Sequence, residues 1–412
     1  MTLHKKLPKS ALIRMGIMTA LAVATLPAQA APSQPKLEVV AQWNRLPYEL
    51  SDTKAQAEWG KNDTKAMLHG VKVDAKGNLY VSTARWGGPE VSATLSRLVK
   101  KGDQWVLQPF PSEKMNDINN PLGLKAVLGF EIDRNNVMWI LDQGHVAGAP
   151  NKQGDAKLIG WDLNADKEIA RYNFSNDEVD FTCSFLNDVA VDNDHGAIYI
   201  TDSGIMCHPL KGALLVYNIK TGKAKRVLSD PKWVNDQPGF TFAIHGEKVL
   251  KDKDGKPNAM LTGADGIALS GDKKTLYWTN LTGNRLLSVP TASLRDFSNS
   301  EAKIEQGIKV VNTLPSNTDG MTADSQGNLY MTALTLNGLI KRDVKTGRVT
   351  PYVTNDAIAW PDTIGWGPDG YLYFVSNHLN SWVGGEMNFD NPKVANFTIY
   401  KVHVGGKPYT AN

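Results

Sequence analysis

Several common features are scarce or missing in this chain of 412 residues. It has two cysteines, Cys183 and Cys207, and no Cys-x-x-Cys pair, so a cysteine-based metal or dithiol redox site has little support. Beyond the N-terminus, no segment approaches the roughly 18 consecutive apolar residues that a membrane span requires. No Pro/Ser-rich linker interrupts the chain, which favours one domain despite the length.

An excess of basic residues is also absent. The chain has 45 Lys and Arg against 42 Asp and Glu, and four of the basic residues (Lys5, Lys6, Lys9 and Arg14) lie within the first 30 positions. Without that segment, 41 basic and 42 acidic residues are left. Nucleic-acid binding needs a clustered positive surface, so we expect no nucleic-acid partner.

Residues 1–30 have the features of a secretory signal peptide. The basic opening is followed by an apolar stretch from Met15 to Leu26 and by the small-x-small triplet Ala28-Gln29-Ala30. The apolar stretch is too short to span a membrane. We therefore expect cleavage after Ala30 and a secreted or periplasmic protein of residues 31–412; the alternative is a disordered cytosolic N-terminus.

One pattern dominates the rest of the chain. Residues 318–333 predict a hairpin: a short run, Met321–Ala323, leads through a polar turn, Asp324–Gly327, into a second strand-forming run, Leu329–Thr332. Six copies of this pattern start 43 to 78 residues apart, at His69, Leu128, Asn187, Asp265, Asp319 and Asp362. Self-similarity at this spacing is typical of a radial array with one four-stranded unit per copy.

We therefore predict an all-β fold, a six-bladed β-propeller. Residues 37–43 and 397–404 form alternating strands at opposite ends of the chain, and we expect them to pair in the last blade and close the ring. Rotation about the central axis would bring the six starting positions of the copies into a ring at one mouth of the channel. Five of these six positions are polar or charged, Leu128 being the exception.

The two cysteines flank the third copy. Cys183 precedes its first strand and Cys207 follows its second, and because the two strands run antiparallel these ends should be neighbours. In an oxidising compartment this favours a disulfide over two free thiols.

The copies carry a resemblance that covers essentially all of the chain after residue 30. It rests on the segments Trp139–Gly144, Phe185–Asp192, Ile200–Gly204, Gly266–Leu286, Val289–Asp296, Trp360–Asp362 and Ser376–Asn380. Together these segments resemble the yellow / major royal jelly protein family. The resemblance implies an exported six-bladed propeller; bacterial members are related to dopachrome tautomerase, and insect members include dopachrome-converting enzymes and amine binders.

A more distant resemblance is to the calcium-dependent lactonases of the gluconolactonase / regucalcin group. It implies that Asp319 is a metal ligand that doubles as a catalytic base, that Asp265 is a ligand, and that Asn187 lies on the substrate side. One position departs from that group, which has a Glu where this chain has His69, a poor partner for a hard cation.

The residues themselves also support a cation. Three Asp converging in a narrow mouth would repel one another, so they should take up protons or recruit a metal ion. We predict a Ca²⁺ or other divalent-cation site made by Asn187, Asp265, Asp319 and Asp362. The alternative is that each Asp-Gly pair starts its strand as a turn element that hydrogen-bonds its own backbone.

Other candidate ligand-binding residues are His69 and two residues on loops after second strands, Arg85 and His378. Two function classes stay open. In one, a small cyclic or aromatic substrate enters the channel and Asp319 acts as base in lactone hydrolysis or tautomerisation. In the other, the same ring holds a small ligand without chemistry. The absence of a Ser-His-Asp or Cys-His motif does not separate these classes. We expect a monomer with no organic cofactor.

Overall fold

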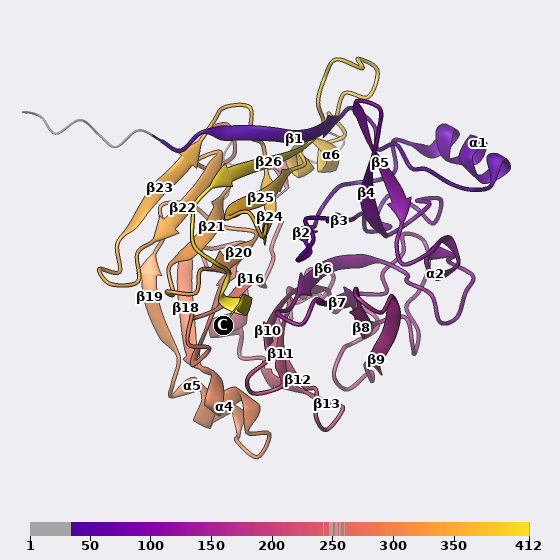
Figure 1. The fold of residues 1–412 in the computed structure, drawn as a ribbon. Coiled ribbons are helices and arrows are strands. Elements are labelled where there is room, and N and C mark those ends of the chain that lie inside the picture. The colour runs from indigo at the N-terminus through magenta and orange to yellow at the C-terminus, as the bar shows by residue number, and fades with distance from the viewer. Residues whose placement is uncertain are drawn as a thin grey trace, which may run out of the picture. The chain divides into compact units, whose positions relative to one another are not determined.

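Each repeat copy forms the two inner strands of a four-stranded antiparallel sheet. The computed structural model describes residues 34–241, 243–246, 250–251, 254, 257–258 and 260–411. In this part of the chain six such sheets surround one centre, as Figure 1 shows, and each inner strand contacts the inner strands of the two neighbouring sheets. The prediction of a six-bladed propeller is confirmed.

The blades, given from the inner to the outer strand, are the following: β2 (Val71–Val73), β3 (Leu79–Ser82), β4 (Leu95–Lys101), β5 (Gln104–Pro109); β6 (Val127–Ile132), β7 (Val137–Asp142), β8 (Lys157–Asp162), β9 (Lys167–Asn173); β10 (Leu186–Asp192), β11 (Ala197–Asp202), β12 (Ala213–Asn218), β13 (Lys223–Leu228); β16 (Ala264–Leu269), β17 (Thr275–Asn280), β18 (Arg285–Pro290), β19 (Lys309–Thr313); β20 (Met321–Ala323), β21 (Leu329–Ala333), β22 (Gly338–Arg342), β23 (Val349–Thr354); and β24 (Pro361–Trp366), β25 (Tyr371–Ser376), β26 (Phe397–His403), β1 (Leu37–Trp43).

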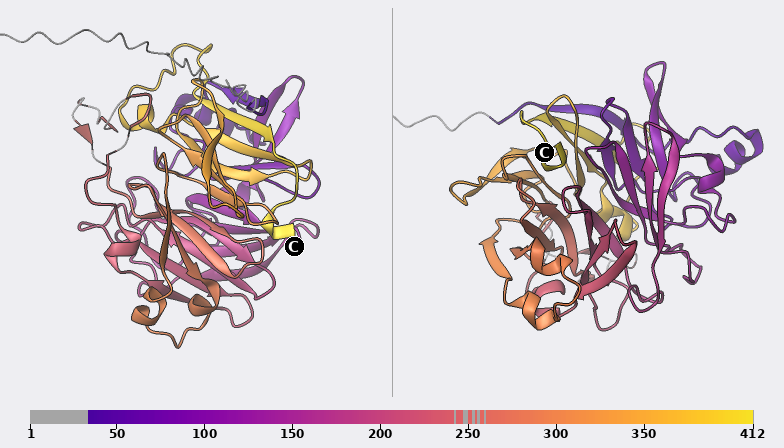
Figure 2. Two further views of the ribbon diagram at one scale, coloured as in Figure 1. Left: turned by 90° about the vertical axis from the view of Figure 1, so that its left-hand side faces the viewer. Right: turned by 60° about the horizontal axis from the view of Figure 1, so that its bottom comes forward.

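The last blade is built from both ends of the chain. β1 pairs antiparallel with β26, with Leu37 opposite Val402 and Trp43 opposite Phe397. This is the predicted closure, and it gives the strand from the N-terminal side a partner in a sheet that would otherwise end at β26. Figure 2 shows the same ring from two further directions.

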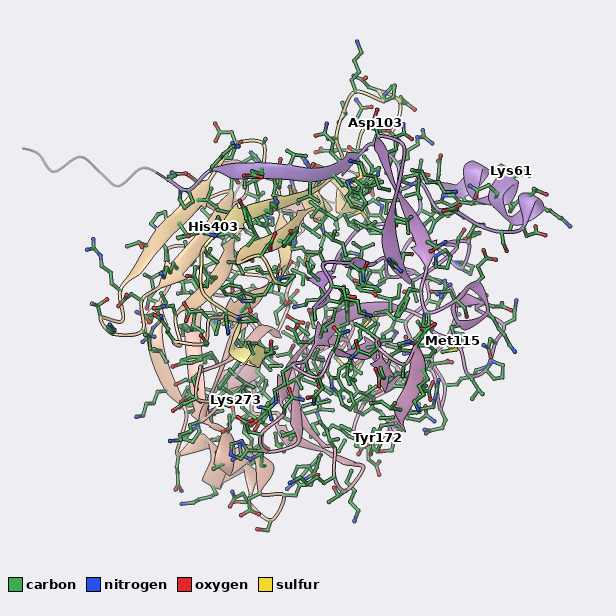
Figure 3. All side chains as sticks on the ribbon, viewed as in Figure 1. Lys61, Asp103, Met115, Tyr172, Lys273 and His403 are labelled. Atoms are coloured by element: carbon green, nitrogen blue, oxygen red, sulfur yellow. A yellow bond between two sulfur atoms is a disulfide. The ribbon has the colours of Figure 1, made fainter. Side chains whose placement is uncertain are left out.

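The described part of the chain also contains short helices, a 3-10 turn and a small hairpin outside the six blades. They are helices α1 (Thr53–Asn62), α2 (Glu113–Asn116), α3 (Pro231–Val234), α4 (Thr291–Arg295), α5 (Glu301–Glu305) and α6 (Leu379–Val383), the 3-10 turn η1 (Tyr409–Ala411), and the hairpin β14 (Leu250–Lys251) with β15 (Pro257–Asn258). None of the described helices is long and apolar enough to cross a membrane. Figure 3 shows side chains packed throughout the ring, with charged ones such as Lys61 and Asp103 at its periphery.

The polar turn of the repeat has a structural role of its own. The Asp324 carboxylate accepts hydrogen bonds from the backbone N–H groups of Gln326 (3.0 Å) and Asn328 (2.9 Å). Asp74 holds the equivalent turn of the first blade in the same way. An aspartate that accepts hydrogen bonds from the backbone two to four residues later pre-forms the turn, so each hairpin is specified locally.

Cys183 and Cys207 form a disulfide with a Cα–Cα distance of 4.6 Å, which confirms that prediction. A disulfide persists in an oxidising compartment, so it is consistent with a location outside the cytoplasm. The predicted signal peptide, residues 1–30, lies outside the described residues.

A glycine follows the first position of four copies, and in the second and fourth copies the neighbouring blade leaves no room for a side chain there. A Cβ on Gly129 would lie 2.1 Å from the backbone oxygen of Asn187, and a Cβ on Gly266 would lie 2.3 Å from that of Asp319. No side chain fits at such distances without moving backbone. These glycines therefore let consecutive inner strands approach closely at the axis. If Asp-Gly served only as a turn element, a glycine would not be needed for this close approach.

We expect Gly129→Ala to lower the free energy of unfolding by about 1–3 kcal/mol, because the methyl group would force two inner strands apart. The matched control is Gly60→Ala within α1, where a Cβ has no atom within 4 Å. That change should stabilise the protein by about 0.5–1 kcal/mol through helix propensity. Denaturant unfolding of both variants measures the difference, and equal stabilities would contradict the close-approach explanation.

Candidate functional site

The starting positions of the repeat copies meet at one mouth of the central channel. In four blades the pairing of the first hairpin is irregular at this point, for example between Ala264 and Ile267 and between Pro361 and Ile364. Such bulges interrupt the ladder and change the direction of a side chain. Asp265 and Asp362 lie within these irregular segments.

Five of the six starting positions line one cavity of about 410 Å³. At its deep end lie Leu128, Asn187, Asp265, Asp319 and Asp362, and the three Asp are between 1% and 8% exposed. The segments before and after the inner hairpins supply mostly apolar walls: Trp86, His145, Val146, Phe185, Ile205, Met206, Met260, Leu281, Leu379, Trp382 and Val383. The cavity is therefore an apolar pocket that ends on three carboxyl groups.

Aromatic rings form a continuous section of the wall. The ring centroids of Trp86 and Phe185 are 5.3 Å apart, and those of Phe185 and His145, which stack, are 6.3 Å apart. The disulfide lies directly behind this wall, because Cys183 precedes Phe185 by two residues and Cys207 follows Met206. The covalent bridge therefore holds together two segments that line the same side of the cavity.

Each carboxyl group at the deep end has defined hydrogen-bond partners. Asp319 Oδ2 accepts from the indole N–H of Trp360 at 2.6 Å, and Asp362 Oδ2 accepts from the Asn377 amide at 2.7 Å. Asp265 Oδ2 accepts from the amide of Asn187 at 2.8 Å.

The carboxyl groups of Asp265 and Asp319 lie close enough for each to affect the ionisation of the other.

Burial raises the pKa of all three carboxyl groups in this cluster. Loss of solvation, followed by the nearby charge of Asp362, raises the pKa of Asp319 to about 8, and burial raises the pKa of Asp362 to about 7. Burial also raises the pKa of Asp265 well above its usual value, with Asp319 as the next cause. Carboxyl groups forced together away from water retain protons.

His69, the sixth starting position, lies behind the cavity wall. It is fully buried, its Nδ1 is 3.4 Å from Asp362 Oδ2, and its ring centroid is 4.1 Å from that of Trp86. Burial lowers its pKa to about 3, so the imidazole is neutral. Its Nε2 has no hydrogen-bond partner. His69 thus supports Asp362 and Trp86 from behind and does not line the cavity.

The other two candidate residues are not among the described residues that line the cavity. Arg85 is 1% exposed and donates its hydrogen bonds to backbone carbonyls of Val91, Leu124, Lys125 and Asn116. It braces loops, while its neighbour Trp86 faces the cavity. His378 caps α6, and the next residue, Leu379, is the one that lines the cavity.

The four residues predicted to bind a metal ion all line the cavity. Among the described residues, no three His, Cys, Asp or Glu side chains are arranged to hold a metal ion. One oxygen of each of the three Asp already accepts a hydrogen bond from the protein, although Oδ1 of Asp265 receives none. Hard cations need several ionised oxygen ligands. The side chains as they lie do not form a ready-made metal site, and calcium binding stays a prediction.

Sequence reasoning missed the residues that position the carboxyl groups. Trp360 is fully buried with a φ of +50°, a conformation that a bulky residue rarely adopts, and it directs its N–H to Asp319. Such strain is often found at functional sites. A signal was available, because Trp360 and Phe185 both precede the start of a copy by two residues. Asn377 and Ser203, which hold Asp362 and Asn187, both follow a second strand directly.

We expect Trp360→Phe to raise the pKa of Asp319 above about 8, because the indole N–H stabilises the ionised form. Infrared or NMR titration of the aspartate carboxyl groups measures the shift. Trp366→Phe is the matched control, since its indole donates to Thr322 of the neighbouring blade and not to Asp319. An unchanged Asp319 titration in Trp360→Phe would contradict the assigned contact.

The raised pKa values also predict a pH dependence of stability. Folded Asp319 and Asp362 keep protons up to about pH 8 and 7, whereas the unfolded chain releases them near its ordinary value of 3.8. Their contribution is therefore fully present below about pH 4 and is lost as the pH rises to about 8. The free energy of unfolding should decline less steeply over this interval in Asp319→Asn. Asp103→Asn, an exposed change, should follow the wild type.

Comparison with known proteins assigns a family. The family model described as major royal jelly protein matches residues 126–405. Major royal jelly protein 8 of Apis mellifera is 23% identical over 281 residues, which are 62% of this chain and 60% of that protein. The match thus spans less than two thirds of the length of this relative.

One solved structure supports the fold, and two further structures resemble it less. A luciferin-regenerating enzyme has a TM-score of 0.50 at 15% identity, covering 91% of this chain and 97% of that chain. A calcium-binding regucalcin from Agrobacterium tumefaciens has a TM-score of 0.49 at 14% identity, covering 84% and 95%. A gluconolactonase from Xanthomonas campestris has a TM-score of 0.49 at 11% identity, covering 90% and 95%. At these identities the likeness concerns the fold alone. The family match, by contrast, extends over most of the blades, and the chain belongs to the major royal jelly protein family.

Proposed function

We propose that the cavity binds a small organic amine with a flat apolar body. The observation that carries this proposal is the combination of three carboxyl groups at the deep end with the absence of any lysine or arginine among the described residues that line the cavity. A buried carboxylate needs an opposite charge or a proton. Without a ligand these groups hold protons, and a bound ammonium group would supply the missing positive charge.

The cavity walls suit the flat apolar body of such an amine. Trp86, Phe185 and Trp382 offer aromatic faces that pack against a flat ring and attract a cation. A volume of about 410 Å³ is in the range of small-molecule pockets. The predicted leader and the disulfide favour an exported protein that meets its ligand outside the cytoplasm.

A second candidate function is proton transfer of the tautomerase type. It is favoured by one observation, the pKa of about 8 at Asp319, because an acid that titrates near neutral pH can both accept and donate a proton. In this reading Asp319 moves the proton while Asp362 and Asn187 hold the substrate. Lactone hydrolysis of the calcium-dependent kind would need the metal site as well, so the arrangement supports it less.

Binding of phenethylamine compared with 2-phenylethanol tests the main proposal, since the two differ chiefly in charge. By calorimetry the amine should bind at least about tenfold more tightly, which is ~1.4 kcal/mol. Its affinity should rise from pH 6 to pH 8.5, because ionised carboxyl groups pair with the ammonium group and fewer protons have to be displaced.

Asp319→Asn should abolish most of the preference for the amine and leave the alcohol unaffected. Asp103→Asn at the β4–β5 turn should bind both compounds like the wild type. Equal affinity for the two compounds at every pH would overturn the proposal.

Turnover assays separate binding from catalysis. Dopachrome and a panel of lactones should be incubated with the protein with and without a chelator, beside a calorimetric titration with Ca²⁺. Chelator-insensitive conversion of dopachrome that is lost in Asp319→Asn is the result expected for the second candidate. Lactone hydrolysis that the chelator abolishes, together with Ca²⁺ binding, would instead support a calcium-dependent lactonase. Amine binding without any turnover would make the protein a carrier.

A further inference from the structure

The second mouth of the channel is covered by the C-terminal segment. After β26 the chain turns at Gly405 and Gly406, which have φ values of +67° and +81°, and continues to η1. Figure 1 shows this yellow segment ending next to β10 and β16 in that view. In the left view of Figure 2 the C-terminus and the β14–β15 hairpin lie on opposite sides of the ring. Met260, shortly after that hairpin, lines the carboxyl cavity, so the tail covers the other end.

The segment is attached to three blades. It leaves β26 of the last blade, and Lys407 accepts a hydrogen bond of 2.8 Å from the backbone N–H of Ser325 at the turn of the fifth blade. Pro408 forms a bridge with Asp324 in the same turn. The Tyr409 hydroxyl accepts a hydrogen bond of 3.2 Å from the backbone N–H of Val191 in β10 of the third blade. The tail therefore crosses the axis.

Tyr409 fills space that small residues leave on the axis. It is 2% exposed and belongs to one apolar cluster with Ala190 and Ala268. These two alanines stand three residues after the starts of their copies, where two other copies carry Lys72 and Glu131. Two adjacent blades thus provide an alanine-walled space for an aromatic ring.

The remaining part of this layer is polar and already paired. Lys72 Nζ lies 3.0 Å from Glu131 Oε2 and donates to the Ile364 carbonyl at 2.8 Å. A cavity of about 350 Å³ outside this pair is lined by Lys407, Pro408 and Tyr409 among others. The second mouth of the channel is therefore blocked in two places. The tail blocks the side of the third and fourth blades, and the Lys72–Glu131 ion pair blocks the side of the first and second blades.

We propose that the second mouth is an aryl-binding pocket that the chain fills with its own Tyr409, so that the carboxyl cavity opens at one mouth only. The pocket has an apolar wall, Ala190 and Ala268, and one directed donor, the Val191 N–H, a combination that suits a phenol. Vacating it would give the channel a second opening and expose a site for a phenolic compound. This inference does not depend on which ligand the carboxyl cavity takes.

An introduced thiol can report on the pocket, because both natural cysteines are bridged. Ala268→Cys places a thiol in the apolar cluster that contains Tyr409, in the full chain. Maleimide should modify it slowly there, and at least about tenfold faster when Tyr409→Gly is added. Tyr409→Phe should keep the protection, since the ring and not the hydroxyl fills the space. Added p-cresol should restore protection in the Tyr409→Gly variant.

Ala165→Cys, on the exposed turn between β8 and β9, is the control and should react equally in every background. Circular dichroism checks that the variants fold. If Ala268→Cys perturbs the packing, faster hydrogen exchange of the Val191 amide in Tyr409→Gly gives the same information without a thiol. Unchanged labelling and exchange in Tyr409→Gly would overturn the closure, and fast labelling that p-cresol does not slow would overturn the phenol pocket.

Discussion

Six inner strands pack around one axis, and the narrow space they leave there determines the role of every axial side chain. The strands approach so closely that Gly129 and Gly266 meet the backbone of the next blade. At one level this geometry brings Asp265, Asp319 and Asp362 together. Three residues further along, small side chains leave room for Tyr409. Ring closure by β1 and β26 maintains the constraint, since an open ring would let the blades separate.

The carboxyl cluster costs stability and is held in place by the surrounding structure. Burying ionisable groups without opposite charges disfavours the folded state at neutral pH. The Trp360 backbone is in a left-handed conformation, which adds strain of about 1–3 kcal/mol for such a residue. The buried carboxyl groups and the strained Trp360 backbone both lower stability at one pocket. Packing alone does not explain their presence there, which agrees with a binding or proton-transfer role.

Much of the fold could be predicted because its information is local and repeated. Asp74 and Asp324 pre-form their turns within a few residues, and the alternating runs around them define the inner hairpins. The convergence of Asn187, Asp265, Asp319 and Asp362 followed from symmetry alone. The neighbours of these positions were harder to predict. Arg85 and Trp86 are adjacent in sequence, yet one braces loops and the other faces the cavity, because the loop path decides the direction of each side chain.

The sequence by itself determined the number of blades, the closure, the disulfide and the set of polar side chains on the axis, because each follows from repetition or from antiparallel pairing. Only the tertiary structure decided that His69 lies behind the wall, that Trp360 reaches Asp319, that the carboxyl groups keep protons, and that Tyr409 enters the second mouth. These outcomes depend on burial and on contacts between residues far apart in the chain. Neither the solvation of a group nor the path of a loop is encoded in any single repeat copy.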